Sequence, residues 1–327
     1  MQNVAVIGLG SIARRHRKNL KQLYPDCTLF AMSASGRQPE QAISDCDQLV
    51  ESVDTLIEGK ADLVIVASPA PFHARHALPL IRAGIPVLIE KPLVTESADL
   101  EALLQASQYY QTPVAVGYCL RYLPSAQKMQ QLLQTETIGM LYNASIEIGQ
   151  YLPDWRPDKD FRTTVSAKAE LGGGALFELS HELDYSRWLL GELDIKAAVL
   201  RSSEALQLDV EDCVDLLAVS EQGVVTSIHL DFLQRAVHRR CRFTGSSGSL
   251  EWDLIENSIA FSDQHGSKML YQEPCWDKNR MYLDMIRDFE NKVNGKEHQC
   301  VSLEDAGKTI TLIESIRQHA QAGSATP

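Results

Sequence analysis

The chain has 327 residues, of which 44% are hydrophobic and 23% charged, which is typical of a globular protein long enough for two domains. Its net charge of -12 argues against nucleic acids and anionic membranes as partners. The seven cysteines lack metal-binding or redox spacing, and no apolar run approaches a membrane span. We therefore expect a cytoplasmic protein with reduced thiols and no metal site.

The chain opens on a strand, a glycine turn and a helix. The strand Val4–Ile7 is followed by the pattern GxGxxA. In this pattern Gly8 permits the sharp turn, Gly10 lets a pyrophosphate approach the backbone, and Ala13 keeps the helix close to its strand. The start of the helix adds bare N–H groups with a partial positive charge. The expected phosphate-binding residues are Gly8, Gly10, Ser11, Ile12 and Ala13.

The next strand, expected over Cys27–Ser33, ends where a dinucleotide fold faces the adenosine ribose. An acidic residue there would bond the ribose 2′-OH, but the sequence has Ser33, Ser35 and Arg37 instead. Two hydroxyls and a guanidinium suit a 2′-phosphate, so we expect NADP rather than NAD. The alternative interpretation is a solvated loop with an incidental arginine.

Strands and helices then alternate, which predicts a doubly wound parallel sheet. The elements expected here are a partly helical Gln41–Lys60, the buried strand Asp62–Ala67, the helix Phe72–Ala83, the strand Pro86–Ile89, the helix Ala98–Tyr110 and the strand Val114–Tyr118. Because ligands of such sheets lie at the carboxyl ends of the strands, Lys91 is expected to point into the site. We expect this dinucleotide-binding domain to span residues 1–120.

The pattern changes after about Arg121, and residues 121–327 read as an α+β domain with a large, mainly antiparallel sheet. The expected elements are helix Ser125–Gln134, strand Leu141–Ile148, helix Ala175–Leu190, hairpin Val210–Ser220 with Val224–Leu233, strands Arg239–Thr244, Ser249–Trp252, Ser258–Ser262 and Lys268–Gln272, helix Asn279–Val293, and a helix after Ser302. Ser302 and Asp305 resemble a capping box at the start of this last helix.

Six segments in this order resemble the glucose–fructose oxidoreductase/inositol dehydrogenase (Gfo/Idh/MocA) family over nearly the whole chain. They are GLGSIARRH, SPAPFH, EKP, VGYCLRYLP, GGGALFELSHELD and VSLEDAGKTI. The resemblance implies an N-terminal Rossmann domain and a C-terminal open sheet that makes subunit contacts, as in a homodimer or homotetramer. It also implies a sugar or cyclitol substrate, with Lys91 and His181 as the catalytic pair.

The sequence departs from the family at one point. Many relatives have an aspartate four residues before the histidine, whereas here Glu178 lies three residues before His181. Asp184 lies three residues beyond His181, so all three are expected on one helical face, and we include Asp184 among the catalytic residues.

Hydride transfer to or from nicotinamide is cofactor chemistry, and the protein must manage one proton. His181 suits this task because histidine titrates near neutrality. Lys91 suits it as a partly buried base or as a cation that stabilises an alkoxide, and which of the two is the base stays open. The structural alternatives are a surface lysine before proline and a core or capping histidine.

Other candidates lie at the strand ends and in the second domain. Ser68, Pro69 and His73 are expected near the cofactor, with His73 either supporting that site or capping its helix. Glu90 is expected to orient Lys91 or bond backbone, and the family implies that Pro92 fixes the lysine peptide, with a cis bond as one form. Arg14, Arg15 and His16 are interpreted as a polar helix face.

Arg121 is expected either to grip the substrate or to tie the domains together. Tyr151, Trp155 and Arg156 are expected to line a sugar pocket, or else to form an exposed loop. The surrounding segment, GQYLPDWRPDKDFR, resembles family members of surface-sugar pathways, which adds nucleotide sugars to the candidate substrates.

The sequence therefore predicts an NAD(P)-dependent dehydrogenase or reductase acting on CH–OH groups of a small sugar-type molecule. Two alternatives stay open. One is a cofactor-binding regulator or scaffold that has lost the chemistry, and the other is an enzyme that regenerates its nicotinamide in an internal redox cycle.

Overall fold

The computed structural model describes residues 1–39 and 43–324, which form two compact units. The first contains Met1–Cys119 and Asn279–Ile310, and the second contains Leu120–Lys278 and the chain from Thr311 onward. The chain thus returns to the first unit after completing the sheet of the second.

The first unit is built on a six-stranded parallel sheet of order β3-β2-β1-β4-β5-β6. Its strands are β1 (Asn3–Ile7), β2 (Thr28–Met32), β3 (Gln48–Val50), β4 (Leu63–Val66), β5 (Val87–Ile89) and β6 (Val114–Val116). All four residues of β4 are buried, as an apolar run covered on both faces requires. This is the Rossmann strand order, which confirms the predicted doubly wound sheet and places its switch point between β1 and β4.

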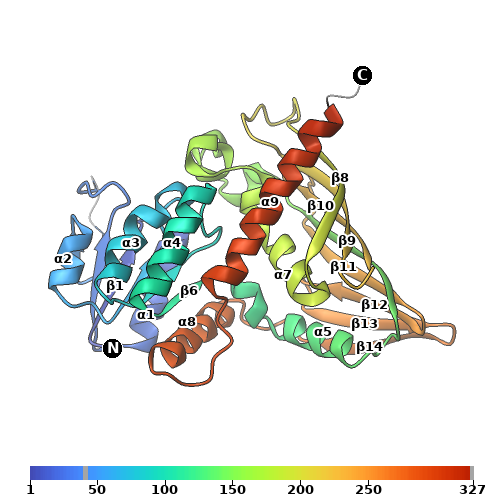
Figure 1. The fold of residues 1–327 in the computed structure, drawn as a ribbon, viewed down its shortest axis with the longest axis horizontal. Helices are drawn as coiled ribbons and strands as arrows, with labels where there is room; N and C mark the ends of the chain where they lie inside the picture. The colour runs from blue at the N-terminus through green and yellow to red at the C-terminus, as the bar shows by residue number, and fades with distance from the viewer. Residues whose placement is uncertain (40–42, 325–327) are drawn as a thin grey trace. The chain divides into compact units, whose positions relative to one another are not determined.

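Helices cover this sheet. They are α1 (Ser11–Leu23), α2 (Val53–Glu58), α3 (His73–Arg82) with the short 3₁₀ helix η1 (Ala70–Phe72) before it, α4 (Ser97–Tyr110), α8 (Arg280–Val293) and the first part of α9 (Leu303–Ser324). Figure 1 shows α3 beside α4, and α1 contacts α8. At the start of α9, Ser302 Oγ accepts a hydrogen bond from the Asp305 N–H at 3.1 Å, so the predicted cap forms.

The second unit is built on an eight-stranded sheet of order β14-β13-β12-β11-β7-β10-β9-β8. The strands are β7 (Leu141–Gly149), β8 (Leu193–Arg201), β9 (Cys213–Ser220), β10 (Val225–Asp231), β11 (His238–Gly245), β12 (Gly248–Asp253), β13 (Ser258–Asp263) and β14 (Gly266–Gln272). Neighbouring strands are antiparallel except β7 and β10, so the prediction of a mainly antiparallel sheet is confirmed. The sequence analysis missed β8, whose register shifts between Ile195 and Ala197.

One face of this sheet packs against helices. These are α5 (Pro124–Gln134), α6 (Ala175–Glu178) and α7 (Ser180–Leu190), and Figure 1 shows α5 and α7 on one side of the strands. Short 3₁₀ helices fill the connections: η2 (Cys119–Tyr122), η3 (Leu152–Trp155), η4 (Phe161–Thr163), η5 (Val165–Ala167) and η6 (Ala169–Leu171). Leu216 is buried while Leu217 beside it on β9 is exposed, as expected for a sheet with one covered face.

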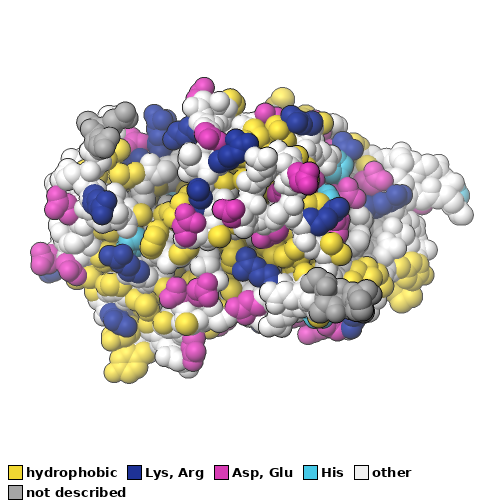
Figure 2. All heavy atoms as spheres, turned by 90° about the horizontal axis from the view of Figure 1, so that it is seen from above, with side chains coloured by type: hydrophobic (Ala, Val, Ile, Leu, Met, Phe, Trp, Pro, Cys, Tyr) yellow, Lys and Arg dark blue, Asp and Glu magenta, His cyan; other side chains and the backbone are white. Residues whose placement is uncertain are grey.

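On the face of the molecule shown in Figure 2, acidic and basic side chains are interspersed, so the excess negative charge forms no single patch there. None of the seven cysteines, all of which lie within the described residues, forms a disulfide. None of the helices in the described part of the chain combines the length and apolarity needed to cross a membrane.

Candidate active site

The glycine turn joins β1 to α1 and leaves its backbone accessible. Gly8 has φ +121°, and a Cβ there would lie 2.3 Å from the carbonyl oxygen of Ala67. Gly10 is the N-cap of α1, and no heavy atom of the described residues lies within 4 Å of where its Cβ would be. As a glycine, Gly10 cannot cap the helix with a side chain. The turn therefore fits a pyrophosphate bound by the first N–H groups of α1, from Ser11 to Ala13.

The buried side chain of Arg17 bonds the backbone of this turn. The Arg17 guanidinium donates to the Gly8 carbonyl at 3.1 Å and to both carboxylate oxygens of Asp45 at 2.7 and 3.2 Å. Arg17 is only 2% exposed. The sequence analysis missed Arg17, because it cannot be told from Arg14 and Arg15 in sequence until the burial of each side chain is known.

The loop after β2 is closed by its own serines. Ser33 Oγ donates to the Arg37 carbonyl at 2.7 Å, and Ser35 Oγ accepts from the Arg37 N–H at 3.4 Å. Arg37 itself is exposed. The two hydroxyls thus shape the loop through the Arg37 backbone, and the Arg37 guanidinium takes no part in these two bonds.

A buried histidine, His76 on α3, joins this loop to the end of β4. Its Nδ1 lies 3.0 Å from Ser68 Oγ, and the ring also bonds the backbone of Ala34. Burial lowers the pKa of His76 to about 4, so the ring is neutral at pH 7. His76 was not among the predicted site residues.

His73, at the start of α3, joins two strand-end loops. Its Nε2 lies 2.7 Å from the Ser68 carbonyl oxygen, next to Pro69, and its Nδ1 lies 3.0 Å from the Leu93 carbonyl oxygen. Burial lowers the pKa of this ring, which is 1% exposed. A neutral imidazole carries one N–H, so His73 donates to one of these two carbonyls and packs against the other, between the loops after β4 and β5.

Lys91 follows β5 at the carboxyl edge of the sheet and is partly buried. The Lys91–Pro92 bond is cis. Glu90 Oε2 accepts the Lys91 backbone N–H at 3.1 Å, and Glu90 Oε1 lies 2.6 Å from His16 Nε2. The interpretation of His16 as part of a polar helix face is wrong, because its side chain is fully buried.

Close packing requires glycine at Gly174, the last residue of the triple glycine in the second unit. Gly174 has φ +101°, and a Cβ there would lie 2.5 Å from Glu211 Oε1. That same oxygen accepts the Leu176 N–H at 3.1 Å, and the Glu211 carbonyl accepts the Ala175 N–H at 2.8 Å. Burial raises the pKa of Glu211. The glycines thus bring the start of α6 onto a buried glutamate.

The predicted helix Ala175–Leu190 is two helices that meet at Leu179, whose φ of -101° and ψ of 25° interrupt the run. Glu178 ends α6 and accepts a hydrogen bond from Ser166 Oγ at 2.9 Å. His181 lies in the first turn of α7. The expected single helical face shared by Glu178, His181 and Asp184 is therefore wrong, because the chain is not one continuous helix there.

The acidic side chains of α7 are engaged in buried ion pairs. Asp184 accepts two hydrogen bonds from the Arg121 guanidinium, at 2.6 and 2.9 Å, and Glu182 accepts two from Arg239, at 2.6 and 2.9 Å. Both carboxylates are essentially inaccessible to solvent, whereas His181 is partly exposed. The structure thus brings Arg121 and Asp184 together and leaves His181 as the accessible ionisable side chain of this turn.

The segment after β7 holds the remaining candidates. Tyr151 lies under the Arg235 guanidinium, 3.7 Å from ring centroid to Cζ, and Trp155 on η3 packs edge-on against Phe232 at 5.4 Å. Trp155 Nε1 is buried without a hydrogen-bond partner among the described residues. Arg156 is exposed. Tyr151 and Trp155 are thus held by packing.

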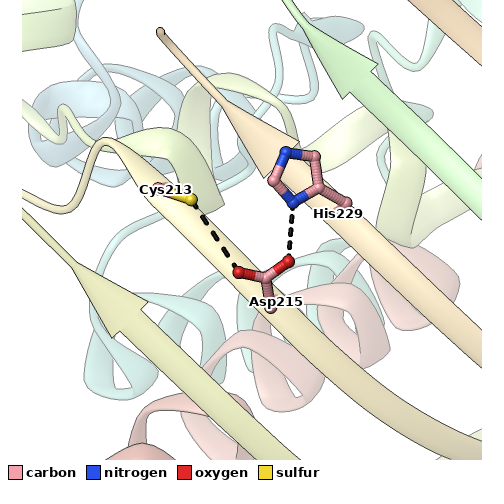
Figure 3. Close-up of side chains that lie close together, drawn as sticks. All are labelled: Cys213, Asp215 and His229. Carbon is pink, nitrogen blue, oxygen red and sulfur yellow. Dashed lines mark hydrogen bonds and ion pairs between the residues drawn. The ribbon is translucent and has the colours of Figure 1, made fainter.

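Outside these segments, Cys213, Asp215 and His229 lie close together on β9 and β10 (Figure 3). His229 bonds Asp215 at 2.7 Å and Asp231 at 2.9 Å, and these bonds, with Asp231 the strongest, raise its pKa to about 9 against the effect of burial. The Arg201 guanidinium lies 2.9 Å from the same Asp215. Two cations therefore already neutralise the two carboxylates, and a metal ion here would have to displace both a proton and a guanidinium.

Two family models match the sequence. A model described as an oxidoreductase family with an NAD-binding Rossmann fold matches residues 2–118, and the GFO/IDH/MocA C-terminal domain matches residues 126–251. Together they cover most of the chain.

Curated relatives and a solved structure agree with these matches. Inositol 2-dehydrogenase 2 of Saccharopolyspora erythraea is 29% identical over 70% of this chain and 66% of its own length. Myo-inositol 2-dehydrogenase of Thermotoga maritima is 25% identical over 95% of this chain and 93% of its own. Levoglucosan dehydrogenase in complex with NADH and levoglucosan has a TM-score of 0.84 over 98% of this chain and 97% of that one, at 19% identity, which is a likeness of fold.

Proposed function

The chain belongs to the Gfo/Idh/MocA family of oxidoreductases, and on that premise we propose that it transfers a hydride between a nicotinamide dinucleotide and a hydroxyl-bearing carbon of a sugar, cyclitol or nucleotide sugar. One observation carries the proposal. The open glycine turn at Gly10 follows β1, and Lys91 follows β5, so both lie at the carboxyl edge of one parallel sheet. This is the edge at which doubly wound sheets bind dinucleotides.

The residues of this edge fit the cofactor. The first turn of α1 would bind the pyrophosphate, and the loop Ser33–Arg37 would face the adenosine ribose. The nicotinamide, when bound, supplies the hydride chemistry. Because Arg37 is exposed and no carboxylate precedes it in this loop, we propose that the chain prefers NADP(H) over NAD(H).

Lys91 and His181 would share the single proton of the reaction. Lys91 would hold the substrate oxygen as a base or as a cation beside a developing alkoxide. His181 is the partly exposed ionisable group of α7, and its ring would exchange the proton on the substrate side. Asp184 would act indirectly, since its carboxylate is bonded to Arg121 and fixes α7.

The substrate would be held by the second unit. Tyr151 and Trp155 offer ring surface for the apolar face of a sugar ring, and Arg156 offers a fork of donors for its hydroxyls. We propose Arg121 as a support for α7 and for the Trp188 ring, which lies 5.6 Å from its Cζ.

We also propose that the uncovered face of the eight-stranded sheet forms contacts between subunits of a homodimer or homotetramer. Val199, Leu217 and Val225 are exposed on neighbouring strands of that face. Contiguous exposed apolar residues of this kind are typical of an interface.

The test is turnover of the purified protein with NADP⁺ and NAD⁺ against myo-inositol, levoglucosan and UDP-N-acetylglucosamine, followed by nicotinamide absorbance. We expect Lys91→Ala and His181→Ala each to lose about 10²–10⁴-fold in single-turnover rate, the usual contribution of acid–base catalysis. Their nucleotide affinities should stay near that of the wild type, because phosphate binding resides in the glycine turn. Their effects should not add fully, since both act on one proton.

Matched controls are Lys18→Ala on α1 and His265→Ala between β13 and β14, two exposed residues far from these roles. Nucleotide binding without turnover of any substrate, in every variant, would favour a regulator or scaffold. Exchange of label between substrate and nicotinamide without net reduction would favour an internal redox cycle. Wild-type turnover in His181→Ala would remove it from the catalytic pair.

A further inference from the structure

His16 is the one ionisable residue of α1 that is fully buried and directed at the lysine segment. Its Nε2 lies 2.6 Å from Glu90 Oε1. A carboxylate only accepts hydrogen bonds, so Nε2 carries the hydrogen and donates it. His16 Nδ1 is buried and has no hydrogen-bond partner among the described residues, so the contact with Glu90 is the polar contact that fixes the ring.

The Glu90 carboxylate relays this contact to Lys91. Its second oxygen, Oε2, accepts the backbone N–H of Lys91 at 3.1 Å. The carboxylate lies against Gly117, where a Cβ would lie 3.1 Å from its Cδ, so the glycine leaves the space that the carboxylate occupies. Glu90 also donates its backbone N–H to the Val66 carbonyl at 2.9 Å, which holds it against β4.

The other side of the His16 ring is held as well. Tyr282 on α8 packs edge-on against it at 6.0 Å between ring centroids, and the Arg15 guanidinium lies 4.6 Å from the same tyrosine ring. Burial raises the pKa of Tyr282. The imidazole is therefore clamped between a ring and a carboxylate, in an orientation set by packing.

Beyond the lysine, the chain is held again where His73 Nδ1 contacts the Leu93 carbonyl. Lys91 is thus a partly buried residue of a segment that is held on both sides. On the N-terminal side of Lys91, one hydrogen bond joins His16 on α1 to Glu90 and a second joins Glu90 to the Lys91 backbone. The first turn of α1 is the proposed pyrophosphate site. Two hydrogen bonds therefore separate the phosphate-binding helix from the backbone of the proposed catalytic lysine.

From this geometry we infer that His16 is a positioning residue, which through Glu90 sets the place of Lys91 relative to the cofactor. The inference rests on the proposed function for the role of Lys91. His16 does not touch the reacting atoms. Removing its N–H leaves the buried Glu90 carboxylate without its strongest partner, so that carboxylate shifts and moves the Lys91 backbone with it.

The test compares His16→Met, which removes the donor and keeps the bulk, with His16→Gln, whose amide N–H can reach the same carboxylate. We expect His16→Met to lose about 10- to 100-fold in single-turnover rate, since a misplacement of about 1 Å has this cost. Nucleotide affinity should change by less than about 3-fold, and His16→Gln should recover most of the rate. The control is Asn19→Ala on the same helix, which removes two hydrogen bonds between the buried Asn19 and Asn279.

A double-mutant cycle separates positioning from general damage. In the Lys91→Ala background, His16→Met should cause less than about a 2-fold further loss, because its effect passes through the lysine. Additive losses, or a loss in Asn19→Ala as large as in His16→Met, would mean a merely structural role. If Lys91→Ala keeps full turnover, the proposed function has the wrong catalytic residue, and that result differs from a failure of His16 alone.

A second readout requires no substrate. Trace acetylation of the lysine amines, measured by mass spectrometry across pH, gives the reactivity of Lys91 relative to exposed Lys18. We expect His16→Met to change this ratio by at least about 3-fold and His16→Gln to restore it. An unchanged ratio in His16→Met would overturn the inference whatever the substrate is.

Discussion

Replacing Arg121 by methionine tests a buried ion pair of the second unit. Arg121 and Asp184 are joined by two hydrogen bonds of 2.6 and 2.9 Å, and their side chains are 10% and 2% exposed. The replacement keeps much of the bulk of the arginine stem but leaves a carboxylate that is buried and has lost its cation. Since both residues lie in the second unit, the effect is expected in its stability first.

The magnitude follows from burial. Breaking a buried pair by removing one partner costs about 3–5 kcal/mol, because the remaining charge stays desolvated. Replacing both partners by apolar residues of similar volume is often close to neutral. Arg121→Met should therefore cost about 3–5 kcal/mol in unfolding free energy, and the double variant Arg121→Met with Asp184→Leu should recover most of that loss.

Urea denaturation, followed by tryptophan fluorescence and circular dichroism, measures the unfolding free energy of the single variant and of the double variant. The control is Arg242→Met, which breaks an exposed pair with Glu251 at 3.6 Å, where about 0–1 kcal/mol is expected. A loss below about 1 kcal/mol for Arg121→Met would refute the reasoning. So would a double variant as unstable as the sum of the two single ones, since the pair would then not be the source of the cost.

Arg37→Ala should reduce NADPH affinity by about 1.5–3 kcal/mol while leaving NADH affinity unchanged, and titration of both nucleotides decides it. Gly8→Ala should abolish nucleotide binding, because the added Cβ would lie 2.3 Å from the Ala67 carbonyl oxygen and displace the turn. The positive φ of Gly8 alone should cost the variant about 1–3 kcal/mol in unfolding free energy. His229, whose pKa is raised to about 9 chiefly by Asp231, stabilises the fold fully below pH 6.5 and loses this effect as the pH rises through 9. Because its side chain is about one third exposed, the unfolding free energy of the wild type relative to His229→Gln should fall by only about 1–2 kcal/mol over that range. Light scattering should report a dimer or tetramer at micromolar concentration, and a monomer would contradict the proposed subunit contacts.

The parallel sheet could be predicted because its strands carry their own signal. The run Asp62–Ala67 is apolar without alternation, which a strand buried on both faces requires, and the structure places β4 there. The hairpin of β9 and β10 was predicted from alternation around a turn at Glu221–Gly223, and the two strands pair antiparallel as expected. In contrast, β8 has a register shift that breaks the period of two, so its pattern resembled neither a strand nor a helix.

His73 was expected near the cofactor, but the contacts of the buried histidines could not be predicted, because they depend on which loops meet at the sheet edge. His16, His73 and His76 look alike in sequence, as polar residues on helices of mixed composition. In the structure His16 contacts Glu90 after β5, while His73 and His76 both contact Ser68 after β4, and none of the three is more than 3% exposed. A polar residue on an otherwise apolar helix face is the signal that would have indicated such a role for His16.

The two units hold the residues proposed for function by different physical means, and this difference has a consequence for specificity. In the first unit the loops are held by the His73 ring, which contacts two backbone carbonyls, and by Gly8, where a Cβ would collide with the Ala67 carbonyl. Few side chains can substitute there without moving the cofactor edge. In the second unit α7 is fixed by ion pairs on its buried side, whereas Tyr151 and Arg156 flank the short helix η3 outside the strands. Substitutions at these two residues are therefore expected to change the choice of substrate while nucleotide affinity stays constant, and a change in both together would show that the units do not divide the work in this way.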